Sequence, residues 1–127
     1  MRNAERLLDF SRPVAVILVA VLQFIPDADD PYAITAQLMD AVPPGSFLVI
    51  SHPTRDIQTS QVSEFVQRYN SRAAEPARFR THDEVSRFFR GLRVLEPGVV
   101  RIPEWRPSGP AESASPANMW GGVAIKD

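Results

Sequence analysis

The feature that most constrains the fold is an apolar segment at residues 14–25, in which Gln23 is the one polar side chain. Its first part, residues 14–21, is rich in β-branched side chains and does not alternate with polar ones. Such a run predicts a strand covered on both faces, as in parallel sheets flanked by helices. The segment is shorter than the ~20 apolar residues that a membrane-spanning helix needs.

A secretory signal peptide has an apolar core of similar length, and the arginines that precede residue 14 imitate its basic start. However, Glu5 and Asp9 lie within that start. The acidic stretch 26–30, which begins with proline, follows where a small-residue cleavage site would lie. We therefore expect a cytoplasmic protein without a membrane segment.

The next elements alternate between helix and strand. Asp30 followed by Pro31 marks a helix start, because the carboxylate accepts from free backbone N–H groups and proline needs no acceptor. The spacing predicts one buried stripe on this helix, made of Ile34, Leu38 and Val42. A second apolar strand at 47–50 follows, so the two strands and the helix form a βαβ unit.

Two more helices are predicted, at about 60–72 and after Thr81, where Thr81 and Glu84 form a capping box. The buried face of the second helix consists of Val85, Phe88 and Phe89, and Gly91 is placed to end it. Short strands are predicted at 92–95, 99–102 and 120–125. The proline-rich stretch 103–118 predicts a mobile loop.

Composition narrows the function classes. A chain of 127 residues with 44% hydrophobic and 23% charged residues fits a single α/β domain over 1–127. The 14 basic and 15 acidic side chains give a net charge of -1, which argues against a nucleic-acid partner. The absence of cysteine excludes disulfides and thiol nucleophiles, and two histidines are too few for a histidine-rich metal site.

The first strand also demands more structure than the sequence supplies. A strand that is apolar on both faces needs cover and neighbours, since a bare apolar edge invites aggregation. All six glycines lie at or after Gly45, and none forms the G-x-G-x-x-G turn that cradles a dinucleotide. We therefore expect a partner chain or upstream segments, and an incomplete cofactor cradle.

Four segments follow one another at residues 14–30 (VAVILVAVLQFIPDADD), 40–52 (DAVPPGSFLVISH), 95–107 (LEPGVVRIPEWRP) and 121–126 (GGVAIK). In this order they resemble the C-terminal half of bacterial S-adenosylmethionine-dependent methyltransferases with a Rossmann-like fold, in a family of largely uncharacterised members. The resemblance spans about residues 7–126. It implies strands four to seven of a seven-stranded sheet, with the last strand antiparallel between its neighbours. The glycine-rich cofactor loop of the N-terminal half has no counterpart here.

The resemblance also implies a site, because ligands of open α/β sheets lie beyond the carboxyl ends of the strands. Leu22, Gln23 and Phe24 match a Leu-His-Phe segment that lies close to the sulfonium cofactor in the family, so we expect them to contact S-adenosylmethionine. Gln23 cannot take a proton from a substrate, and a purely structural amide is the alternative for it. His52 matches a histidine after the fifth strand and is the expected substrate contact; the alternative is a loop histidine before Pro53. No catalytic residue is assigned.

Several charged and aromatic side chains favour structural roles. Three aspartates, Asp27, Asp29 and Asp30, could hold a hard cation, but we favour helix capping. The ten basic and seven acidic residues over 55–106 leave a net +3 without a nucleic-acid-binding motif, so we interpret the arginines as a solvated helical face. These arginines are Arg68, Arg72, Arg78, Arg80, Arg87 and Arg90. His82 is expected to be an exposed first-turn residue, and Trp105 and Trp120 to be core or rim residues.

Two functions follow. The first is the C-terminal portion of a methyltransferase that acts on a small-molecule acceptor and binds S-adenosylmethionine weakly on its own. The second is a non-catalytic, truncated homologue whose sheet edge forms a homodimer or captures a partner, such as the missing N-terminal half.

Overall fold

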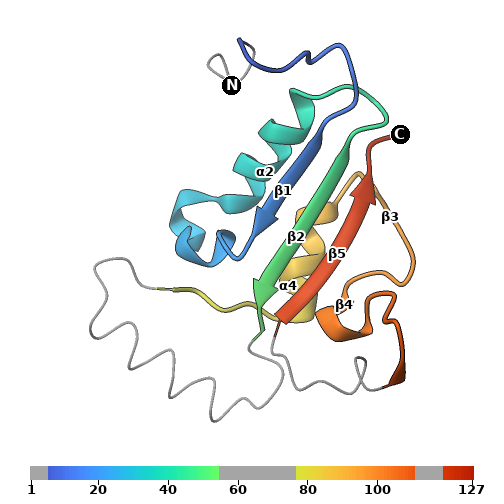
Figure 1. Ribbon diagram of the computed structural model, residues 1–127. Coiled ribbons are helices and arrows are strands. Elements are labelled where there is room, and N and C mark those ends of the chain that lie inside the picture. Colours follow the sequence, from blue (N-terminus) through green and yellow to red (C-terminus); the bar gives the residue numbers. More distant parts are fainter. Residues whose placement is uncertain (1–5, 55–76, 111–118) are drawn as a thin grey trace.

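The computed structural model describes residues 6–54, 77–110 and 119–127, which build a mixed sheet with helices (Figure 1). The strands are β1 (Ala15–Val19), β2 (Phe47–Pro53), β3 (Arg93–Val94), β4 (Val100–Arg101) and β5 (Met119–Ile125). The strand order is β1-β2-β5-β3, and β4 also pairs with β5. β1 and β2 are parallel, and β5 runs antiparallel to β2, β3 and β4. The expected α/β sheet with an antiparallel last strand between its neighbours is therefore confirmed.

Helix α2 (Pro31–Asp40) connects β1 to β2 and begins as predicted, since the Asp30 carboxylate accepts from the Ala33 N–H at 3.1 Å. The predicted buried stripe is wrong. Pro31, Thr35 and Met39 face inward, Ile34 is exposed, and the buried Val42 lies beyond the end of the helix. Thr35 can be buried because its hydroxyl donates to the Pro31 carbonyl at 2.9 Å, which satisfies its polar atom.

The short helix α4 (His82–Ser86) continues into the 3-10 turn η3 (Arg87–Phe89). Thr81 and Glu84 form the predicted capping box, and Val85, Phe88 and Phe89 are buried. Gly91 has a φ of +83°, a left-handed conformation that favours glycine and ends the element. The predicted helix at 60–72 and part of the predicted loop, 111–118, lie outside the described residues.

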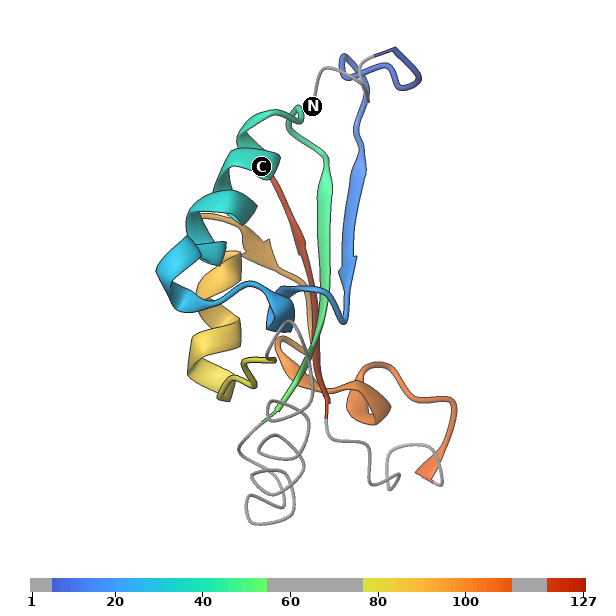
Figure 2. The same ribbon diagram turned by 90° about the vertical axis from the view of Figure 1, so that its left-hand side faces the viewer.

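α2, α4 and η3 pack on one face of the sheet (Figure 2). Gly122 in β5 makes this packing possible, because a Cβ there would lie 3.1 Å from the Phe89 ring. The core on this side is formed by the buried side chains of Leu22, Met39, Val42, Leu48, Ile50, Val85, Phe88, Phe89 and Ala124. None of the helices that the structure describes has the length and apolar character to cross a membrane.

The opposite face of the sheet is largely uncovered by the described residues (Figure 2). Ile17 of β1 pairs with Val49 of β2, which pairs with Val123 of β5, so the three side chains form one apolar row. Ile17 is 61% exposed. The expectation that β1 is covered on both faces is therefore wrong for the described part of the chain, where β1 is also an edge strand.

Candidate functional site

The candidate site begins where β1 ends. Ala20 adopts a left-handed φ of 52°, which turns the chain out of the sheet, and its N–H donates to the Ser51 carbonyl at 3.1 Å. The 3-10 turn η1 (Leu22–Phe24) follows directly. Leu22 and Gln23 are buried in this turn, whereas Phe24 is exposed. The three predicted cofactor contacts thus lie at the carboxyl end of the first strand.

His52 lies at the carboxyl end of β2 and is 0% exposed. Its Nδ1 is 2.9 Å from the Pro53 carbonyl, and its Nε2 is 2.8 Å from Nη1 of Arg80. Since an arginine can only donate, Nε2 accepts, and the ring proton sits on Nδ1 and is donated to the Pro53 carbonyl. Burial lowers the pKa of His52 from 6.5 to about 4, so the ring is neutral near pH 7.

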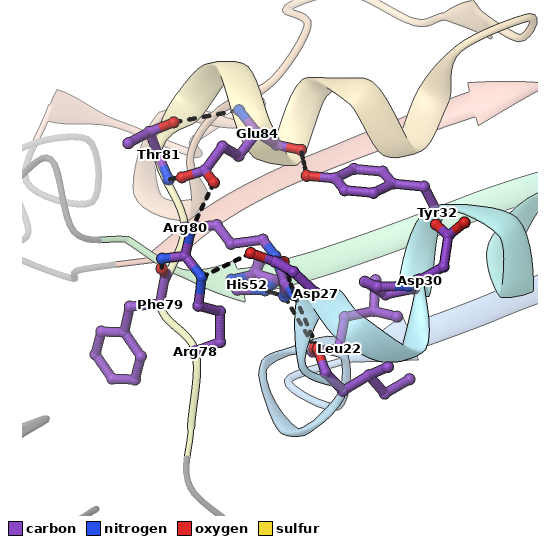
Figure 3. Close-up of polar contacts among 12 residues, drawn as sticks. Leu22, Asp27, Asp30, Tyr32, His52, Arg78, Phe79, Arg80, Thr81 and Glu84 are labelled. Atoms are coloured by element: carbon purple, nitrogen blue, oxygen red, sulfur yellow. Dashed lines mark hydrogen bonds and ion pairs between the residues drawn. The ribbon is translucent and has the colours of Figure 1, made fainter.

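Arg80 is the centre of the site (Figure 3). Its side chain is fully buried, and Nη1 also donates to the Leu22 carbonyl at 2.9 Å. Nη2 donates to the Ile25 carbonyl at 2.8 Å and to the Asp27 carboxylate at 3.0 Å. One guanidinium therefore joins the turn after β1 to the histidine at the end of β2.

Arg78 lies on the more exposed side of the contacts made by Arg80. It contacts the Asp27 carboxylate at 3.1 Å and the Glu84 carboxylate at 2.9 Å, which links the turn after β1 to the start of α4. The hydrogen bond from Arg80 holds the pKa of Asp27 below its ordinary value. Burial would raise the pKa of Glu84, but the Thr81 N–H and the charge of Arg78 lower it overall.

The segment that carries both arginines crosses the two strand ends. The Arg78 N–H donates to the Gln23 carbonyl at 2.7 Å, and the Arg80 N–H donates to the Pro53 carbonyl at 3.3 Å. Arg80 also forms an isolated parallel bridge with Thr54. The backbone of the η1 turn is thereby hydrogen-bonded to a chain segment more than fifty residues away.

Two buried polar atoms of the site have no hydrogen-bond partner among the described residues, namely Oε1 of Gln23 and Nε of Arg80. Gln23 is 7% exposed. Buried polar atoms are nearly always paired, so an unpaired acceptor at a strand end indicates a place for a ligand or a water molecule. Because Oε1 of Gln23 is an acceptor, it suits a partner that carries an N–H or O–H donor.

The arginines of this site were not predicted. The interpretation of Arg78 and Arg80 as members of a solvated helical face is wrong, because both lie on an extended segment and Arg80 is buried. The capping role favoured for Asp27 is also wrong, since its carboxylate pairs with both arginines. The exposed side chains of Arg87 and Arg90 agree with the prediction, whereas Arg68 and Arg72 lie outside the described residues.

The remaining predicted residues lie around the site. His82 is not simply an exposed residue, since its Nε2 contacts the Val99 carbonyl at 2.7 Å and its ring meets Trp120 edge-on at 5.0 Å. Trp105 lies under the Arg106 guanidinium. Among the described residues, no group of three or more histidine, aspartate or glutamate side chains could hold a metal ion.

A separate groove of about 530 Å³ lies between α2 and η3. Lys126 and Asp127 at the carboxyl end of β5 line it, together with Tyr32 and Phe88. Because β5 is antiparallel to β2, Lys126 and Asp127 lie toward the amino end of β2. Phe88 lies toward the other end of the groove, where its ring centroid is 5.6 Å from the Arg80 guanidinium.

The comparisons with known proteins agree with this geometry. The S-adenosyl methyltransferase family matches residues 1–127. The chain belongs to this family. Among curated proteins, none matches the chain.

Solved structures show the same fold. A DUF574 family protein from Streptomyces avermitilis is 35% identical, with a TM-score of 0.87 over 94% of this chain and 47% of its own. A protein from Thermobifida fusca that is provisionally named a methyltransferase is 30% identical, with a TM-score of 0.81 over 98% of this chain and 47% of its own. TnmH, at 19% identity and a TM-score of 0.58 over 94% of this chain and 34% of its own, shares the fold alone. The chain thus spans about half the length of the first two structures.

Proposed function

We propose that this chain forms part of an S-adenosylmethionine-dependent methyltransferase that acts on a small molecule, and that it supplies one wall of the cofactor crevice. The observation that carries the proposal is the unpaired, buried Oε1 of Gln23 at the carboxyl end of β1. Open α/β sheets bind ligands where the strand order reverses. The described strand order runs from β1 toward β2 only, so the proposal places the reversal at the free edge of β1, where further strands of the whole protein would pair.

Leu22, Gln23 and Phe24 are the residues that would hold the cofactor in this proposal. The Gln23 amide oxygen would accept from a cofactor N–H group, and the half-exposed Phe24 ring offers an apolar contact. S-adenosylmethionine supplies an electrophilic methyl group when it is bound. The chain's own contribution is then to bind and align the reactants, which can itself lower a barrier by ~7–11 kcal/mol at most.

Acid–base catalysis by His52 is not part of this proposal, because both ring nitrogens are engaged and the pKa is about 4. Its predicted contact with the substrate stays a prediction. A small-molecule acceptor is supported by the low net charge of -1 and by a site built from a short turn rather than a broad basic face.

The test is a titration of the chain with S-adenosylhomocysteine, followed residue by residue in amide NMR spectra. We expect weak binding that shifts the signals of 22–24, and we expect Gln23→Leu to weaken binding about tenfold by removing the acceptor. Gln37→Leu, on the exposed side of α2, is the matched control and should bind like the wild type. Equal binding by Gln23→Leu and the wild type would refute the proposed contact.

A second candidate function is non-catalytic self-association, and the edge strand β1 favours it. β1 consists of apolar residues alone, without the charges or prolines by which proteins usually protect a sheet edge. Its outer edge is unpaired within the described part of the chain. The exposed Ile17 belongs to the apolar row of the uncovered face, and Val19 of the same strand is also exposed. We propose a second copy of the chain as the occupant, paired through β1 about a two-fold axis.

Sedimentation velocity over a wide concentration range tests this second candidate. The wild type should form a dimer, whereas Ile17→Lys should remain a monomer with little loss of stability because position 17 is exposed. Ile34→Lys places the same charge on the exposed face of α2 and should still dimerise. A wild-type chain that stays monomeric at millimolar concentration would exclude the dimer.

A further inference from the structure

Building on the proposed cofactor contact at Gln23, we propose that Arg80 is a positioning residue. It clamps the turn after β1 against the end of β2 and so holds the Gln23 amide at the ligand-binding edge. Two of its contacts go to the carbonyls of Leu22 and Ile25, at 2.9 and 2.8 Å. These carbonyls bracket Gln23 and Phe24, so the guanidinium fixes both ends of the short segment that would meet the cofactor.

The clamp also reaches the neighbouring strand. Nη1 of Arg80 lies 2.8 Å from Nε2 of His52 at the end of β2 (Figure 3). His52 is locked in the Nδ1–H tautomer by this contact and by the Pro53 carbonyl. His52 therefore serves as an acceptor that anchors Arg80, and the two strand ends keep a fixed separation.

The backbone of Gln23 is held while its side-chain oxygen is left without a partner. The Gln23 carbonyl accepts from the Arg78 N–H at 2.7 Å, so the main chain cannot turn away without breaking this bond. Oε1 of Gln23 has no hydrogen-bond partner among the described residues, even though Gln23 is buried, with 7% of the residue exposed. A fixed backbone with an unpaired acceptor is a pre-organised ligand contact, which loses little freedom when a ligand binds.

A purely stabilising role explains this arrangement less well. Burying a guanidinium is costly, and apolar residues of similar volume often stabilise a core as well or better. The Arg80 guanidinium contacts the carbonyls of Leu22 and Ile25 after β1 and the His52 ring nitrogen at the end of β2, in a geometry that a planar fork of donors can satisfy together. Lysine offers three donors on a single atom and cannot reach these acceptors at once, so it keeps the charge and loses the clamp.

The experiment compares Arg80→Lys with the wild type and with Arg90→Lys, which makes the same change at an exposed position. The first readout is the long-range ¹H–¹⁵N NMR spectrum of the His52 ring, which distinguishes a protonated from an unprotonated nitrogen. The second readout is the change in the NMR signals of the Gln23 side-chain amide when S-adenosylhomocysteine is added, called the Gln23 response below. We expect Arg80→Lys to release the fixed tautomer of His52 and to weaken binding about tenfold or more.

Two further variants keep the test decisive if Arg80→Lys does not fold. His52→Phe preserves the ring but removes the acceptor, and should weaken the Gln23 response. His52→Gln restores an acceptor at a similar reach and should recover binding to within about threefold of the wild type. A merely structural role predicts loss of stability without this difference between the two variants.

The outcomes separate this inference from the proposed function. If Arg80→Lys folds and its His52 tautomer and Gln23 response equal those of the wild type, Arg80 is not a positioning residue. If the wild type shows no response to S-adenosylhomocysteine, the proposed cofactor contact fails. In that case the tautomer of His52 and the backbone signals of Leu22 and Ile25 still decide whether Arg80 holds the turn: a change in Arg80→Lys supports the clamp, and unchanged signals overturn it.

Discussion

The buried His52 makes a quantitative prediction about acid stability. Burial lowers the pKa of His52 from 6.5 to about 4 in the folded protein, and the adjacent charge of Arg80 acts in the same direction. The unfolded chain takes up a proton near pH 6.5, whereas the folded chain does so only near pH 4. Between these values the unfolded state binds more protons, so stability falls as the pH drops from 6.5 to 4. At ~1.4 kcal/mol per pKa unit, the loss amounts to about 3 kcal/mol.

Urea unfolding of the wild type and of His52→Gln between pH 4 and 7 measures this loss. Glutamine does not titrate but keeps an acceptor for Arg80. The lowered pKa values of acidic groups such as Asp27 and Glu84 affect the pH dependence of both proteins alike, so their contribution cancels in the difference. The free energy of unfolding of the wild type should therefore fall by about 3 kcal/mol relative to that of His52→Gln when the pH is lowered from 7 to 4. His82→Gln, on the half-exposed first turn of α4, controls for the loss of a histidine. A difference that stays constant within ~0.5 kcal/mol would refute the reasoning.

Three further changes test the local physics of the fold, each by urea unfolding at pH 7. Thr81→Ala removes the capping box of α4 and should lower the free energy of unfolding by about 1 kcal/mol; an unchanged value would mean that the box contributes nothing. Ala20→Gly relieves a left-handed backbone after β1 and should raise it by roughly 0.5–1 kcal/mol, whereas a decrease would contradict strain at this turn. Leu48→Ala opens a cavity at a fully buried position of β2 and should lower it by about 3 kcal/mol, with Val49→Ala on the less buried face as the milder comparison.

Local chemistry was the part of the fold that the sequence could predict. The start of α2 at Asp30 and Pro31, and the capping box at Thr81, depend on neighbouring backbone groups that are visible in the chain. The inward face of α2 was not predictable from apolar spacing. Thr35 satisfies its hydroxyl within its own helix and can therefore take an inward position that apolar spacing assigns to other residues, while Ile34 is exposed. The antiparallel place of β5 came from the family resemblance, because strand order depends on contacts that no periodicity encodes.

The arginine cluster shows why the rest of the site escaped prediction. Within the turn at Leu22–Phe24, the Leu22 carbonyl accepts from the Ile25 N–H at 3.1 Å. Pro26 offers no N–H beyond the turn, so the carbonyls of Gln23 and Ile25 take their donors from elsewhere in the chain. That need can be inferred from the sequence near β1. The sequence does not show which residue supplies the donors, because Arg80 lies in a stretch of several arginines. Arg80 differs from the others only in the folded chain, where its segment passes alongside the end of β2. A buried charge is therefore selected by the acceptors that surround it, and these acceptors come together only once the strands have paired.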